Sequence, residues 1–124
     1  MWVTEPDNEE NKQIEVFMFS SGDKPSLSHV LSIPFSNGPE SLVIDHTHQR
    51  AYTNLDKEAA VIDVRAHKIV AQWPNSCEKS RGTALDKQRG FLFVGCGEGK
   101  AVVLDVNQNG KQLASLSTGP GVDL

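Results

Sequence analysis

The side chains that could do chemistry in this chain are mainly carboxylates and imidazoles. Aspartate closes four apolar runs, at Asp45, Asp63, Asp86 and Asp105. Two carboxylates that converge can act as general acid and base, but these four fall in separate segments of the chain. A carboxylate at a strand end commonly accepts hydrogen bonds from the N–H groups of the following turn. We therefore expect the four aspartates to cap turns.

Metal binding is the second chemistry to consider. His46 and His48 point the same way only if their segment is extended, and no third ligand is spaced nearby. The acidic stretch 7–11 lacks the alternating ligands and central Gly of a helix-loop-helix calcium site. We expect a solvated loop there, no metal site, and no cofactor.

Nucleophilic and phosphate-binding motifs are also missing. The segment Gly97-Glu98-Gly99-Lys100 lacks the remaining residues of a phosphate-binding loop, so a hairpin turn is the simpler interpretation. The chain has no Gly-x-Ser-x-Gly elbow and no Ser, His and Asp in a recognisable order. The sequence therefore favours a protein that is not an enzyme.

The two cysteines, Cys77 and Cys96, flank a predicted hairpin. Cys77 precedes a predicted strand at 82–86, and Cys96 ends the next strand, at 90–96. Residues placed in this way can come within the roughly 7 Å between Cα atoms that a disulfide allows. The alternative is two buried thiols that pack as small apolar groups.

The elements that position these residues are short strands that recur with a fixed period. Alternating apolar runs bounded by turn residues predict two sets of four strands, at 40–45, 50–55, 58–64 and 68–74, and at 82–86, 90–96, 100–106 and 111–117. Asp45 and Asp86 are 41 residues apart. A period of roughly 40–45 residues is typical of a β-propeller blade. Tyr52, Phe91, Phe93 and Trp73 fall on these strands, and we expect them to pack between blades.

The two ends of the chain read as incomplete copies of the same unit. Strands are predicted at 2–4, 13–19 and 28–35, and the segment 119–124 matches 38–43, where a first strand begins. We predict an all-β fold, a β-propeller segment of about three four-stranded antiparallel blades. It divides into an incomplete blade 1–37, blades 38–79 and 80–118, and the first strand of a further blade at 119–124.

Segments within these predicted blades resemble the repeats of the YVTN-type β-propeller family, which includes lactonase-fold and surface-layer-like propellers. The matching segments are Gly38-Pro39, the "YVTN"-like 50–54 and the "VIDV"-like 61–64. Departures occur at Ser80, where other units have Pro, and at Met18, where other units have Asp. The resemblance implies a propeller fold without a shared catalytic motif. Complete members have six to eight blades, and cysteine placement in exported relatives is compatible with a Cys77–Cys96 bridge while two buried thiols stay the alternative.

The leading functional prediction is a non-enzymatic binding or scaffold module whose ligand is unknown. Propeller ligands usually sit at the central channel, so the candidates are the residues that enter the innermost strands, Glu40, Arg81 and Gly121, with Asp123 just inside. Of these, Glu40, Arg81 and Asp123 carry a charge. One alternative is part of a lactonase-like, metal-dependent hydrolase propeller. The other is a truncated fragment of a longer exported propeller protein.

Charge and hydropathy limit the partners. The net charge of −4 gives no basic stripe for nucleic acid, and no apolar run reaches the roughly 18 residues of a membrane span. No signal peptide is visible, so we expect an intact chain to be cytoplasmic, and a fragment of an exported relative to be periplasmic or extracellular.

An incomplete propeller should expose its terminal blade faces. We expect two apolar sets there: Trp2, Val16, Phe17 and Ile33 in the first blade, and Phe91, Phe93, Val103 and Leu116 in the last. The expected partner is a second copy that closes the propeller as a homodimer, or the missing blades of a longer chain.

Overall fold

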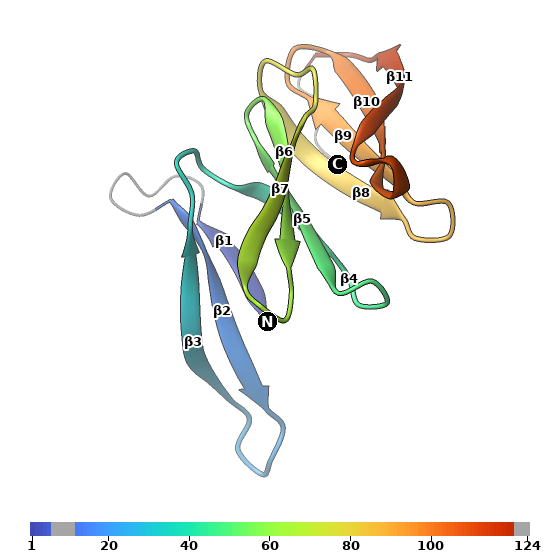
Figure 1. The fold of residues 1–124 in the computed structure, drawn as a ribbon. Helices are drawn as coiled ribbons and strands as arrows, with labels where there is room; N and C mark the ends of the chain where they lie inside the picture. The colour runs from blue at the N-terminus through green and yellow to red at the C-terminus, as the bar shows by residue number, and fades with distance from the viewer. Residues whose placement is uncertain (6–11, 121–124) are drawn as a thin grey trace. The chain divides into compact units, whose positions relative to one another are not determined.

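The computed structural model describes residues 1–5 and 12–120. This part of the chain is all-β: eleven strands form three antiparallel sheets, and the helical content is one 3-10 turn, η1 (Val106–Gln108) (Figure 1). The chain divides into two compact units, Met1–Pro39 and Glu40–Leu124. In residues 1–5 and 12–120, no helix has both the length and the apolar character that crossing a membrane requires.

The first unit holds a sheet in the order β1 (Trp2–Glu5), β2 (Gln13–Ser20) and β3 (Ser26–Pro34). Side chains alternate across a strand, so Ile14 and Val16 fall on one face with Ile33, and all three are buried. The expectation that Val16 and Ile33 form an exposed face is therefore wrong. The exposed apolar residues of this unit lie instead toward the β2–β3 turn: Met18, Phe19, Leu27 and Val30.

The second unit holds two four-stranded sheets. One runs in the order β4 (Glu40–Asp45), β5 (Arg50–Leu55), β6 (Glu58–Asp63) and β7 (Lys68–Pro74). The other runs in the order β8 (Ser80–Asp86), β9 (Phe91–Cys96), β10 (Lys100–Asp105) and β11 (Lys111–Ser117). Each strand pairs with its neighbour in sequence, because the loops are too short for any other antiparallel connection.

The core of the second unit lies between these two sheets. Tyr52, Ala59 and Val61 of the β4–β7 sheet pack against apolar residues of β9 and β10: Leu92, Val94, Cys96, Val102 and Leu104. Val43, Ala71 and Trp73 border this cluster. Successive side chains of a strand point to opposite faces, so Leu92, Val94 and Cys96 of β9 share the buried face, whereas Phe91 and Phe93 lie on the other face and are only partly buried.

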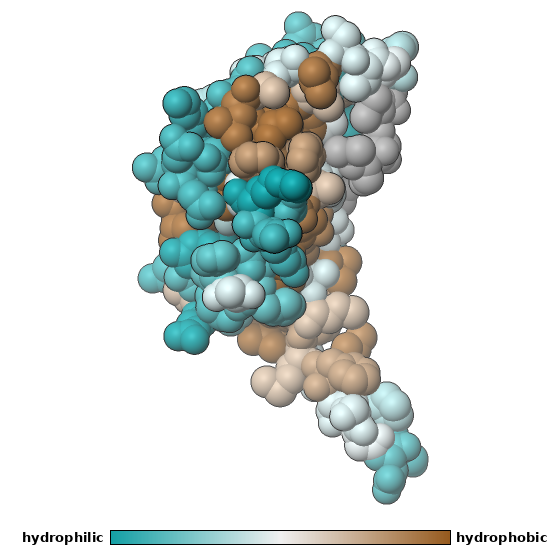
Figure 2. Space-filling model, turned by 90° about the vertical axis from the view of Figure 1, so that its right-hand side faces the viewer, coloured by the Kyte–Doolittle hydropathy of each residue, from teal (hydrophilic) through white to brown (hydrophobic). Residues whose placement is uncertain are grey.

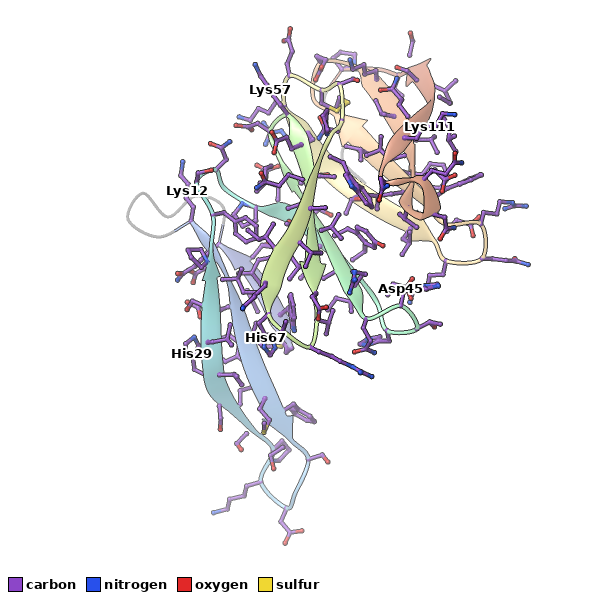
Figure 3. All side chains as sticks on the ribbon, viewed as in Figure 1. Lys12, His29, Asp45, Lys57, His67 and Lys111 are labelled. Carbon is purple, nitrogen blue, oxygen red and sulfur yellow. A yellow bond between two sulfur atoms is a disulfide. The ribbon has the colours of Figure 1, made fainter. Side chains whose placement is uncertain are left out.

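The strand-ending aspartates cap turns, as the sequence predicts. Asp45 lies at the end of β4 (Figure 3) and accepts hydrogen bonds from the N–H groups of Thr47 and His48, at 3.1 and 3.3 Å. Asp63, Asp86 and Asp105 likewise accept from N–H groups two or three residues ahead. The prediction of turn caps is confirmed for all four.

The β10–β11 connection combines a confirmed prediction with a correction. Asn109 and Gly110 have φ angles of 52° and 74°, as expected for an Asn-Gly turn. Val106, predicted as the last residue of a strand, instead begins η1. The Asp105 side chain accepts from the Asn107 N–H and so starts the 3-10 turn one residue early.

The sheet formed by β8 to β11 has apolar side chains exposed to solvent. They are Leu113 and Leu116 of β11. Figure 2, which views the molecule from the side of the third sheet, shows an apolar area bordered by hydrophilic residues. For Leu116 the predicted exposure is confirmed, whereas Phe91, Phe93 and Val103 are partly covered.

Candidate functional site at the start of β4 and β8

The structure brings together two of the three predicted site residues. β4 and β8 contact each other across the two sheets of the second unit. Glu40 begins β4 and Arg81 lies at the start of β8, and a guanidinium nitrogen of Arg81 is 3.2 Å from a carboxylate oxygen of Glu40. Both side chains stay partly exposed, at 27% for Glu40 and 41% for Arg81. The third predicted residue, Asp123, lies outside the described residues.

Both strands are irregular at this point. The register shifts between Glu40 and Leu42 in β4, and between Ser80 and Thr83 in β8. Ser41 has a φ of 59°, a left-handed conformation that is uncommon for a residue other than Gly. Each bulge turns the strand start, so the Glu40 and Arg81 side chains are presented at one place.

A set of buried polar groups holds this backbone. The Ser41 hydroxyl accepts from the Thr83 N–H at 3.1 Å, and the Thr53 hydroxyl donates to the Ser41 carbonyl at 2.6 Å. The Asn54 amide nitrogen donates to the Gly82 carbonyl at 3.0 Å. Thr53, Asn54 and Thr83 are buried. The charged pair therefore stands on a fixed support, because buried hydrogen bonds are costly to break.

Asn54 is also incompletely satisfied. Its side-chain oxygen is buried, and within residues 1–5 and 12–120 no hydrogen bond reaches it. A buried acceptor without a partner costs stability, and such groups are uncommon in native proteins. Nothing in the sequence identifies Asn54 in advance, because the residue looks like any other position of a "YVTN"-like segment.

Cys77 and Cys96 lie at the neighbouring end of the β8–β9 hairpin. The structure joins their sulfur atoms in a disulfide, with the Cα atoms 5.4 Å apart, and Ser80 pairs with Cys96 in the sheet. The Glu98 carboxylate accepts from the Glu78 N–H at 2.7 Å. That backbone hydrogen bond is the main cause that lowers the pKa of Glu98 below its usual value. The segment before β8 is thus tied to the turn after β9.

The histidine considered as a metal ligand has another role. The His48 Nδ1 atom lies 2.6 Å from an Asp45 carboxylate oxygen, and Arg50 pairs with Asp63 at 3.1 Å. Among the described residues, no three His, Cys, Asp or Glu side chains lie close enough together to hold a metal ion. The sequence did not predict either contact, although Asp63 and Arg50 face each other in the β5–β6 register.

The aromatic residues of the β4–β7 sheet pack as predicted but also border open space. Tyr52 belongs to the core cluster, and its ring centroid lies 5.9 Å from that of Trp73. Both side chains line a pocket of about 440 Å³ within the second unit. The sequence does not reveal this pocket, because its walls come from segments far apart in the chain: β5, β7 and the β10–β11 turn.

Comparison with solved structures shows the fold. The chain is similar to the Pseudomonas aeruginosa periplasmic gluconolactonase PpgL (TM-score 0.72, 16% identity, 91% of this chain and 36% of that chain). It is similar to apo AztD from Citrobacter koseri (TM-score 0.63, 20% identity, 92% and 31%). Kuenenia stuttgartiensis hydrazine synthase matches over a shorter part (TM-score 0.59, 15% identity, 68% and 24%).

These likenesses extend over only part of the other proteins. The chain spans 24% to 36% of the length of those three structures. No protein-family model matches the chain, and none of the curated proteins matches it in sequence. At 15% to 20% identity the comparisons establish a propeller-type fold for this chain, built from antiparallel sheets of three and four strands.

Proposed function

We propose that the chain is a non-enzymatic binding module of the YVTN type, which binds a polar ligand at the start of its innermost strands. The observation that carries the proposal is the Glu40–Arg81 pair, in which residues 41 positions apart meet at 3.2 Å. A repeat architecture places equivalent positions of successive blades around one axis. Charged groups at that position are suited to contact a ligand in the channel.

The surroundings of the pair support this proposal. A partly exposed carboxylate and guanidinium can each exchange their mutual hydrogen bond for one to a ligand, at little cost in stability. The bulged strand starts beneath them are held by Ser41, Thr53 and Asn54, so the two groups are preorganised. Asp123 is the candidate in the next copy, two residues beyond Gly121, which is the position equivalent to Glu40.

In this proposal the ligand contacts two copies of the chain. We propose that two chains close head to tail, each C-terminal strand pairing with the free edge of the partner's three-stranded sheet. Six four-stranded blades then surround one channel. Two observations support this arrangement: among residues 1–5 and 12–120, the β1–β3 sheet has three strands where the other two sheets have four, and the 119–124 sequence matches that of residues 38–43, where β4 begins.

A ligand screen tests the binding proposal. The full chain is screened by thermal shift against charged and neutral polar metabolites, and each ligand that stabilises it is titrated against Arg81→Ala, Glu40→Gln and Arg89→Ala. Arg89 is a matched control, because it also pairs with a carboxylate, that of Asp86. We expect Arg81→Ala to weaken binding by about 10-fold or more and Arg89→Ala to leave it unchanged.

Two results would contradict the proposal. One is a ligand whose affinity is the same for Arg81→Ala, Glu40→Gln and the unaltered chain. The other is turnover of a lactone substrate above that of a heat-treated sample, because the proposed module has no catalytic step.

A further inference from the structure

A second site is formed by the pocket between β5, β7 and the β10–β11 turn. It has a volume of about 440 Å³, and all of its lining residues belong to the second unit. Its aromatic lining residues are Tyr52 on β5 and Trp73 on β7. Its polar lining residues are His48 and Arg50 around the β4–β5 turn, and Asn107 and Asn109 near η1. None of them takes part in the Glu40–Arg81 site.

One wall of the pocket is aromatic and firmly placed. The rings of Tyr52 and Trp73 are tilted by 33°, with centroids 5.9 Å apart. Gly110 lies directly against the indole, since a Cβ atom at Gly110 would stand 2.3 Å from two of the Trp73 side-chain carbons. The Trp73 indole is therefore held in position by the backbone of the β10–β11 hairpin.

The basic side chains that line the pocket are already engaged by carboxylates. The His48 Nδ1 atom lies 2.6 Å from an Asp45 carboxylate oxygen, and Arg50 is paired with Asp63 at 3.1 Å. A ligand in the pocket thus meets an imidazole and a guanidinium that each already have a carboxylate partner. Such a set favours a neutral hydroxyl-rich ligand over an anion, because an anion would have to compete with the carboxylates.

Tyr52 supplies a polar group beside the pocket. The residue is buried, at 3% exposure, and it belongs to the pocket lining. Burial, and then the Asp45 charge, raise the pKa of this phenol above its usual value, so the hydroxyl stays a donor at neutral pH. A tyrosine that combines an apolar ring with a hydroxyl is suited to a ligand that has both apolar and polar faces.

We propose that this pocket binds a neutral saccharide. The C–H face of a pyranose ring lies against the Trp73 indole, and ring hydroxyls hydrogen-bond to the Tyr52 hydroxyl and the exposed Asn107 and Asn109 amides. The site is separate from the Glu40–Arg81 site, so binding at one does not depend on binding at the other.

Trp73 fluorescence gives a direct measurement. In a Trp2→Phe background, Trp73 is the single tryptophan. The protein is titrated with cellotriose, maltotriose and chitotriose, and in parallel with glucuronate and galacturonate as anionic rings. We expect a saturable change with at least one neutral sugar, and weaker binding of both uronates.

Two conservative variants assign the binding to the pocket. Tyr52→Phe removes one hydroxyl, and Asn109→Gly removes one amide at a residue with a φ of 52°, which Gly adopts readily. Each should weaken saccharide binding by about 5- to 10-fold. Ser76→Gly is the control, because Ser76 also has a positive φ, is exposed, and does not line the pocket.

The outcomes are decisive in both directions. Loss of affinity in both variants with unchanged affinity in Ser76→Gly supports the saccharide site, and should Tyr52→Phe fold poorly, Asn109→Gly alone supports it. No binding of any neutral sugar, preferential binding of the uronates, or equal binding by folded variants and control would overturn it.

Discussion

At the scale of single residues, the aspartates at strand ends join turn formation to charge pairing. Asp45 is buried, accepts from two backbone N–H groups, and pairs with His48. Burial by itself would raise the pKa of Asp45, but the hydrogen bonds from His48 and from the Thr47 N–H outweigh it and the pKa is lowered. Asp63 and Asp86 repeat the arrangement with Arg50 and Arg89.

We predict from these shifts that stability falls on acidification. Hydrogen bonds from Ala66 and Arg89 N–H groups are the main causes that lower the pKa of Asp63 and Asp86, respectively. A lowered folded-state pKa stabilises the fold above the unfolded value of 3.8, and this is lost as the pH falls through the folded value. The urea midpoint should therefore be steady near pH 6 and drop below about pH 4.

The variant Asp45→Asn tests the residue that is most buried of the three. The amide of Asn cannot accept as strongly from both turn N–H groups. We therefore expect the free energy of unfolding to fall by about 1–3 kcal/mol at pH 7, and the further loss of stability below about pH 4 to be smaller than in the unaltered chain. Glu58→Gln is a suitable control, since Glu58 makes no hydrogen bond to a described side chain. If the urea midpoint of Asp45→Asn fell as steeply below about pH 4 as that of the unaltered chain, the stabilising role of the Asp45 carboxylate would be contradicted.

At the scale of elements, the second unit depends on how the β10–β11 hairpin meets β7. Gly110 has a φ of 74° and lies against Trp73. A side chain at this position would be strained by its backbone conformation and would displace the indole. The same contact positions one wall of the pocket, so packing and the proposed saccharide site rest on one glycine.

Gly110→Ala should accordingly lower the free energy of unfolding by about 2–4 kcal/mol, since conformational strain and overpacking add. Gly119→Ala is the matched control, because a Cβ at Gly119 would meet nothing within 4 Å. Chemical denaturation monitored by Trp fluorescence gives both values. Equal stability of the two variants would mean that the hairpin does not rest on Trp73 in solution.

The β8–β9 hairpin gives a second element-scale prediction. A Cys77–Cys96 bond closes a loop of sequence separation 19, which constrains the unfolded chain by about 3 kcal/mol. Adding reductant should lower the melting temperature of the unaltered chain and leave that of a Cys77→Ser, Cys96→Ser double variant unchanged. Two free thiols in oxidised, denatured protein would show that the bridge does not form.

Regular elements were predictable from the sequence, and contacts between them were not. Strand bounds follow from local alternation and turn residues, so β4, β5, β7 and β11 agree with the predicted ranges. The left-handed Ser41 has no local signal, because its conformation is imposed by the Thr83 N–H on another strand. The pocket beside Trp73 likewise depends on packing between the two sheets of the second unit, and the burial of Val16 and Ile33 is not visible in the local sequence pattern.

The candidate site was predictable only in part, for the same reason. The period indicates that Glu40 and Arg81 occupy equivalent positions, but not that their side chains meet. The Asn54 oxygen without a partner and the Tyr52 hydroxyl depend on three-dimensional surroundings. The predicted blade boundaries and the role of Asp123 stay predictions.

At the scale of the whole molecule, the chain has the propeller-type fold but only part of the length of the proteins it is similar to. β1 and β3 are the edges of a three-stranded sheet, and Met18 and Phe19 are exposed at 66% and 61%. Leu116 is exposed at 62% in the third sheet. Sheet edges and exposed apolar side chains favour association, and this is the physical basis of the proposed closure of six blades by two copies.

The molecular mass in solution, measured by light scattering after size-exclusion chromatography, tests this account most directly. We predict a dimer with twice the 13.6 kDa mass of one chain, and its dissociation or poor solubility when the chain ends at Thr118, because the strand proposed to close the ring is then missing. A stable, cooperatively folded monomer of 13.6 kDa at all concentrations would contradict the proposal that this binding module works as a closed propeller of two chains.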